Sequence, residues 1–125
     1  MLYTSYFSKV KNINPKLLFS VTASKPKFFN GRHLECVSPD YTWVDNYKHG
    51  IIDELQYTNL YINYLNKNKE KIIPEIKSLP DNSMLLCYEA NDKFCHRHVL
   101  AKWLRDNGIQ IEEYNVNEIQ KEELF

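Results

Sequence analysis

The stretch of residues 84–104 constrains the fold most, because it has the pattern of a strand, a polar turn and a helix in direct succession. The run 84–88 is apolar and short enough for a buried strand. The next apolar residues follow the spacing of one helix face, namely Val99, Leu100, Trp103 and Leu104. Gly108 stands where a glycine commonly ends a helix. The sequence therefore predicts a strand–turn–helix unit with residues 95–97 in the first helical turn.

Three chemically active side chains, Cys95, His96 and Arg97, gather at the predicted start of this helix. Unpaired N–H groups and the positive end of the helix dipole make such a turn a natural anion site. Cys95 has surroundings that activate a thiol nucleophile, although a cysteine also packs as a small apolar residue. His96 and Arg97 predict an anion clamp; the alternative is a core histidine and an arginine paired with Glu89 or Asp92.

Further candidates lie in the segments that are expected to surround this corner. Glu89 follows the strand and is a candidate for acid–base work or for binding a ribose hydroxyl; ordinary capping or ion pairing is the alternative. Expected contributors to anion binding, besides Arg97, are Ser5, Lys25, Arg32 and Asn91. Arginine is rare in this lysine-rich chain, so Arg97 favours bidentate recognition that lysine does not provide.

The rest of the chain alternates short apolar runs with helical patterns, which favours an α/β domain. We expect a small, Rossmann-like, mostly parallel sheet of about three to four strands flanked by helices, with the ligand site beyond the carboxyl ends of the strands. The other expected elements are strands at 1–7, 17–23 and 109–111, a loop at 25–39, helices at 40–47, 54–66 and 74–78, and an acidic helical tail at 112–125.

Tyr57, Tyr61 and Tyr64 share one face of the expected helix at 54–66. One interpretation packs this face with its hydroxyl groups at the edge of the core. The other interpretation makes it a wall that stacks on a ligand or donates hydrogen bonds to it.

The motif Phe94-Cys95-His96-Arg97-His98, after the strand that ends in Tyr88-Glu89, resembles the signature of the DUF488 family (domain of unknown function 488). Residues 3–7, the loop from Pro26 to Pro39 and the stretch 47–50 look similar to other parts of that family. The resemblance implies a compact α/β domain but assigns no activity. Many relatives carry an Asp-Val-Arg-like triplet that ends the first core strand, whereas this chain has Val-Thr-Ala-Ser at residues 21–24.

Composition narrows the functional classes. The chain of 125 residues is expected to be a single domain, 1–125. Its 16 basic and 16 acidic residues cancel, so the net charge does not favour nucleic acid, although a local basic patch stays open. No apolar run is long enough for a membrane span. Three cysteines at irregular spacing argue against a disulfide framework and for a cytoplasmic, reducing environment.

Cofactor and metal motifs are absent from the sequence. It contains no glycine-rich dinucleotide fingerprint and no Walker loop, so no cofactor is expected. Cys87, Cys95, His96 and His98 lack the tight knuckle spacing of zinc ligands, and no metal is expected.

The leading hypothesis is a domain that binds an anionic, nucleotide-like ligand or a nucleic-acid end at residues 95–97, with catalysis by Glu89, Cys95 or His96 as a further step. The alternative is a binding module without turnover, which sequesters a nucleotide or docks on a protein. The oligomeric state is left open.

Overall fold

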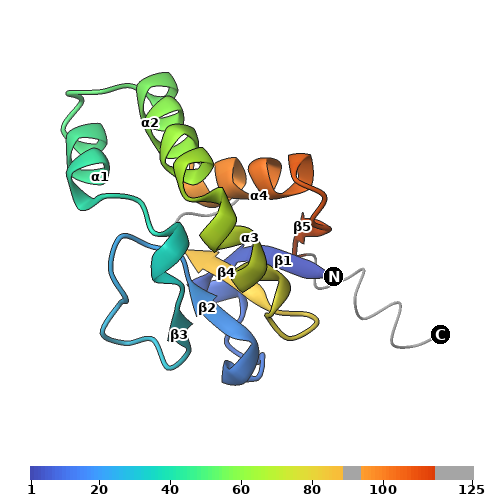
Figure 1. The fold of residues 1–125 in the computed structure, drawn as a ribbon. Coiled ribbons are helices and arrows are strands. Elements are labelled where there is room, and N and C mark those ends of the chain that lie inside the picture. The colour runs from blue at the N-terminus through green and yellow to red at the C-terminus, as the bar shows by residue number, and fades with distance from the viewer. Residues whose placement is uncertain (89–93, 115–125) are drawn as a thin grey trace.

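The computed structural model describes residues 1–88 and 94–114, which form a parallel sheet with helices packed on one side (Figure 1). Within these residues, five strands pair in the order β3-β2-β4-β1-β5, and every pairing is parallel. The strands are β1 (Leu2–Tyr6), β2 (Leu18–Ser20), β3 (Arg32–His33), β4 (Met84–Cys87) and β5 (Ile111–Glu113). The predicted small, mostly parallel α/β architecture is confirmed, with five strands in the described residues where three to four were expected.

Strand β4 is the centre of the sheet, which explains its unbroken apolar sequence. It pairs with β1 on one side and with β2 on the other, and all its residues are buried. A parallel strand that is covered on both faces has no solvent-facing positions, so it carries apolar residues throughout rather than in alternation. The carboxyl end of this strand therefore lies in the middle of the carboxyl edge of the sheet.

Four α-helices lie in the described part of the chain: α1 (Tyr41–Lys48), α2 (Glu54–Lys67), α3 (Lys69–Lys77) and α4 (His96–Asp106). The side chain of Asp40 accepts a hydrogen bond at the start of α1, as expected of an N-cap. Asp53 forms a capping box with Gln56 at the start of α2. None of the helices in the described residues is long and apolar enough to cross a membrane.

The two faces of the sheet are covered differently. One face packs with the helices into the larger apolar core, to which α2, α3 and α4 all contribute buried residues. The other face is covered by a smaller cluster that includes Val10, Leu18, Phe29, Leu86 and Tyr114. Leu86 and Trp103 are buried, as the predicted register requires, and the indole nitrogen of Trp103 donates to Asn66 Oδ1 at 2.8 Å.

Some predicted boundaries are wrong. Pro74 lies inside α3 instead of beginning a helix, because the apolar face with Ile72 and Ile76 already starts one turn earlier. The last strand begins at Ile111, since Gly108, at φ +85°, ends α4 and the N–H of Ile109 still bonds to that helix. The expected loop 25–39 contains β3 and a 3₁₀ turn. Residues 112–113 of the expected helical tail belong to β5, and from residue 115 onward this tail lies outside the described residues.

Candidate functional site

A pocket of about 210 Å³ opens where β2 and β4 end and α4 begins. Its walls come from the segment after β2, from α1 and α2, and from the residues on either side of the β4–α4 connection. They are Thr22, Ala23, Ser24, Tyr41, Val44, Tyr47, Lys48, Tyr57, Tyr88, Phe94, Cys95 and His96. The pocket thus lies at the carboxyl edge of the parallel sheet, the edge at which ligands bind in such folds.

Aromatic rings form one wall of the pocket. The ring centroids of Tyr47, Tyr57 and Phe94 lie 5.2–5.7 Å from one another, distances at which aromatic rings stabilise each other. The three tyrosines of the predicted face of α2 therefore have two different roles. Tyr57 lines the pocket, whereas the hydroxyl groups of Tyr61 and Tyr64 donate to backbone carbonyls of the 3₁₀ turn Glu35–Val37 and hold it against α2.

His96 lines the pocket as a neutral imidazole. Burial lowers its pKa to about 4; the positive charge of Arg97 acts in the same direction, against the hydrogen bond to Val21. In the neutral ring, Nε2 donates to the carbonyl oxygen of Val21, which leaves the lone pair on Nδ1. His96 therefore accepts a proton or a hydrogen bond at neutral pH but contributes no positive charge, contrary to the predicted clamp.

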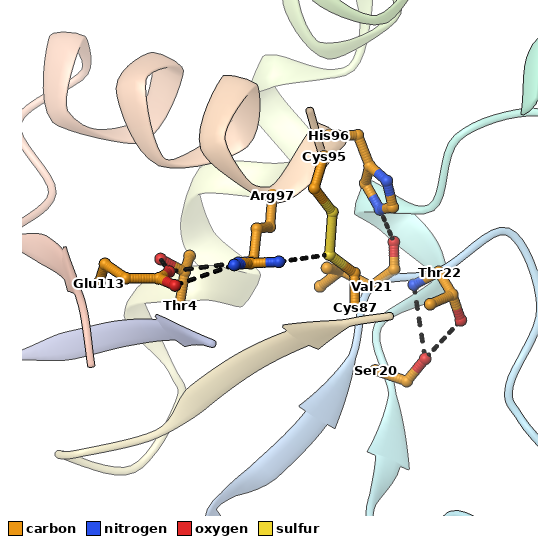
Figure 2. The surroundings of a disulfide bond; sticks show 9 residues. All are labelled: Thr4, Ser20, Val21, Thr22, Cys87, Cys95, His96, Arg97 and Glu113. Atoms are coloured by element: carbon orange, nitrogen blue, oxygen red, sulfur yellow. Dashed lines mark hydrogen bonds and ion pairs between the residues drawn. A yellow bond between two sulfur atoms is a disulfide. The ribbon is translucent and has the colours of Figure 1, made fainter. Parts of the chain in front are cut away.

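Arg97 points away from His96 and toward Thr4 of β1 and Glu113 of β5 (Figure 2). Its side chain is completely buried, and its Nε and Nη2 donate to the two carboxylate oxygens of Glu113 at 3.2 and 2.9 Å. Glu113 also accepts from Thr4 Oγ1 at 2.7 Å. The prediction of a ligand-facing Arg97 does not fit this arrangement, because the guanidinium joins α4 to β5 and β1. Glu113 was not among the acids considered from the sequence, and Glu89 and Asp92 lie outside the described residues.

The same interactions set the protonation state of Glu113. Burial alone raises the pKa of this carboxyl group, but the hydrogen bonds from Arg97 and Thr4 outweigh burial and lower it. A carboxylate and a guanidinium therefore stay charged as a pair. The ring of Tyr6, with its centroid 5.6 Å from the guanidinium carbon of Arg97, covers the cation.

Cys87 and Cys95 form a disulfide between the end of β4 and the residue before α4 (Figure 2). The structure thus corrects the expectation from the cysteine count, because two of the three cysteines pair and Cys36 is the free one. In this state Cys95 has no thiol to ionise, and the predicted nucleophile is not formed. Burial, followed by the nearby Glu75, raises the pKa of Cys36 to about 12, so this thiol is protonated at neutral pH.

Comparison with known proteins assigns the family. The family model DUF488-N3a, described as the active DUF488-N3 subclade, matches residues 21–108, well over half of the chain. The chain belongs to this family. No curated protein and no solved structure matches it. The DUF488 resemblance predicted from the sequence is confirmed at the level of the family.

The span that matches DUF488-N3a contains every residue that lines the pocket but neither Thr4 nor Glu113. The pocket is therefore formed entirely within the family's matched region. The carboxylate that pairs with Arg97 comes from β5, beyond that region.

The remaining predicted anion-binding residues lie apart from this pocket or outside the described residues. Ser5 is fully buried in β1, and its hydroxyl has no partner among the described residues. Arg32 is exposed on β3, with its guanidinium carbon 5.4 Å from the ring centroid of Phe19. Lys25 is exposed next to the pocket residue Ser24. Glu89 and Asn91 lie outside the described residues.

Sequence reasoning missed a chain of hydrogen bonds behind the pocket, which runs through Ser20, Thr22 and His33. Thr22 Oγ1 donates to the carbonyl of Ser24 and so accepts from Ser20 Oγ at 2.8 Å. Ser20 Oγ in turn accepts from His33 Nδ1 at 3.1 Å. The alternating Ser20-Val21-Thr22 pattern was a usable signal for the hydroxyl groups. The hydrogen bond with His33 could not be found from the sequence, because it depends on the register of β2 and β3.

Lys48 was also missed, because it lies in the last turn of α1, far along the chain from residues 95–97. It supplies the positive charge among the described residues that line the pocket. As for metals, the described residues contain no group of three or more His, Cys, Asp or Glu side chains that could hold an ion.

Proposed function

We propose that the protein binds a small anionic, nucleotide-like ligand in the pocket between the aromatic wall and the first turn of α4. The observation that carries this proposal is the meeting of two complementary surfaces in one pocket. Tyr47, Tyr57 and Phe94 offer aromatic surface to a planar base. At the same pocket, α4 begins without a side-chain cap from Cys95, and uncapped N–H groups at a helix start bind phosphate.

The positive charge for this ligand comes from Lys48 in place of Arg97. Lys48 is exposed and lines the pocket, so its ammonium group can approach a phosphate without losing its hydration. Such an exposed charge contributes modestly, because solvent and salt screen it. We therefore assign most of the selectivity to the aromatic wall and the helix start.

Catalysis at this pocket has one candidate base among the described residues. Neutral His96, with its lone pair on Nδ1, is able to take a proton from a bound ligand. Glu89 stays a candidate acid or base from the sequence. The description of the matched subclade as active supports a reaction, without naming one.

The alternative is a binding module without turnover. The described residues that line the pocket include no carboxylate, and Cys95 is held in a disulfide. These two features remove the carboxylates and the thiol that catalysis often uses from that part of the site, which leaves His96. A retained but chemically unchanged nucleotide would favour this alternative.

Calorimetry with the four nucleoside monophosphates and inorganic phosphate tests the proposal, and mass spectrometry of the recovered ligands separates turnover from simple binding. Ser24→Trp fills the pocket mouth from an exposed position and should abolish nucleotide binding. Lys48→Ala should weaken it by roughly 3- to 10-fold, whereas Lys77→Ala, an exposed lysine at the end of α3, should not. Unchanged binding by Ser24→Trp would place the ligand elsewhere.

A further inference from the structure

Three aromatic rings pack against one another beside the pocket mouth, and two of them leave much of their surface in solvent. The ring of Phe7 lies 5.5 Å from that of Phe28 and 5.3 Å from that of Tyr88, and the last two are 6.5 Å apart. Phe28 is 65% exposed and Tyr88 55% exposed. We call these three residues the aromatic platform. Large exposed rings that cluster in this way mark binding surfaces more often than isolated ones do.

The platform continues directly from the pocket. Tyr88 belongs to both, since it lines the pocket and packs against Phe7 and Phe28. The pocket itself, at about 210 Å³, is smaller than the roughly 300–1,000 Å³ of sites that enclose a whole ligand. A nucleotide chain with one base in the pocket would therefore extend past Tyr88 onto the platform.

The loop that presents Phe28 is anchored and positively charged. Phe29 turns inward, is buried and packs on Phe7, with ring centroids 5.1 Å apart. Its neighbour Phe28 is thereby held outward on a fixed support. Lys25 and Lys27 on the same loop are both exposed. Aromatic rings for stacking, beside mobile cations for phosphates, are the combination with which proteins hold single-stranded nucleic acid.

We propose that the aromatic platform is a second base-stacking subsite, and that the ligand is the end of a short single-stranded oligonucleotide. The terminal base enters the pocket, and the next base stacks on Phe28 and Tyr88. Lys25 and Lys27 lie beside the connecting phosphates. This inference rests on the proposed function, because the pocket must hold the first base. It adds the substrate class, a single-stranded oligonucleotide, and the direction in which the strand leaves the pocket, past Tyr88 toward Phe28.

The balanced net charge of the chain does not oppose such a short footprint. Only the few phosphates near the platform need local cations, and the salt dependence of binding reports how many are neutralised. We therefore expect a shallow salt dependence, far below that of proteins with extended basic grooves.

Calorimetry of a nucleoside monophosphate and a single-stranded trinucleotide, each with the wild type and with Phe28→Leu, tests the inference. Leucine keeps an apolar contact with Phe7 but removes the ring. The wild type should bind the trinucleotide more tightly, and Phe28→Leu should weaken that binding by about 5- to 50-fold while mononucleotide binding stays unchanged. Leu55→Ala, at a position equally exposed on α2, should change neither, and thermal melts confirm that the variants are folded.

The possible failures are distinguishable. Equal wild-type affinity for both ligands would overturn the second subsite but leave the proposed function standing. An equal loss for both ligands in Phe28→Leu would also overturn it, because Phe28 would then shape the pocket itself. Absence of binding for both ligands with the wild type would overturn the proposed function and this inference together.

Discussion

The two sides of the first turn of α4 take opposite roles, although His96 and Arg97 are consecutive residues. His96 faces β2 and the pocket, where burial keeps it neutral. Arg97 faces β1 and β5, where it is fully buried and still charged, with Glu113 as its partner. Successive residues of a helix point about 100° apart, so one turn serves both the pocket and the core.

The difference teaches where an arginine at a helix start obtains its stabilisation. A cation at this position interacts unfavourably with the helix dipole. On the sequence alone, this suggested that an anionic ligand lies beside the arginine and compensates it. In the structure the anion is a carboxylate of the protein itself, bound through Nε and Nη2 of the guanidinium. The inference of bidentate recognition was chemically sound, but the partner belongs to the fold.

The largest effect is expected from Arg97→Met. It leaves the half-buried carboxylate of Glu113 without its cation and should destabilise the protein by about 3–5 kcal/mol. Urea denaturation measures this change. The double variant Arg97→Met/Glu113→Gln should recover part of the loss, because the unpaired charge is then gone. A variant with wild-type stability but no nucleotide binding would contradict the structural role of Arg97.

The pocket side of the turn should give stability a pH dependence. The pKa of His96 falls from 6.5 to about 4 on folding, so the unfolded chain binds more protons between these values. Stability contributed by neutral His96 is thus complete above pH 6.5 and is lost as the pH falls toward 4, by about 3 kcal/mol in total. His33 and His98, with lowered pKa values, act in the same direction.

His96→Gln isolates the contribution of His96, because the amide can still donate to the carbonyl of Val21 and has no proton to gain. Urea denaturation at several pH values between 4 and 7 measures the free energy of unfolding, which should change less with pH in this variant than in the wild type. Glu113, with its lowered pKa, acts in a different window: its contribution is complete above 4.5 and is lost as the pH falls below that value. An equal pH dependence in variant and wild type would show that His96 is not buried as described.

The smallest expected effect concerns the reactivity of the cysteine side chains. Without a reductant, iodoacetamide should leave Cys87 and Cys95 unmodified, because both are in the disulfide. After reduction, Cys95, at the start of α4 and on the pocket wall, should react faster than Cys87, which is completely buried in β4. Peptide mass spectrometry reads both. Rapid labelling of Cys95 without reduction would restore the nucleophile hypothesis.

Features that depend on local sequence could be predicted. The apolar run of β4, the capping residues Asp40 and Asp53, and the glycine that ends α4 act within a few residues. Their free energies come from burial of the segment itself or from hydrogen bonds to its own backbone. The position of the pocket at the carboxyl edge also followed, because parallel strands bring their ends together.

Features that join distant segments could not be predicted. Glu113 meets Arg97 only because β5 pairs with β1, and His33 meets Ser20 only through the register of β2 and β3. The disulfide was hidden for a related reason, since the spacing of Cys87 and Cys95 shows no motif until the strand end and the helix start are in place. In each case the partner was set by the packing of the sheet.

A crystal structure of the protein with a bound nucleoside monophosphate tests the central claim most directly. The account predicts density for the base against Tyr47 and Tyr57, with the phosphate at the start of α4 and the pair of Arg97 and Glu113 intact. A nucleotide whose phosphate is bound by Arg97, with Glu113 displaced, would contradict it.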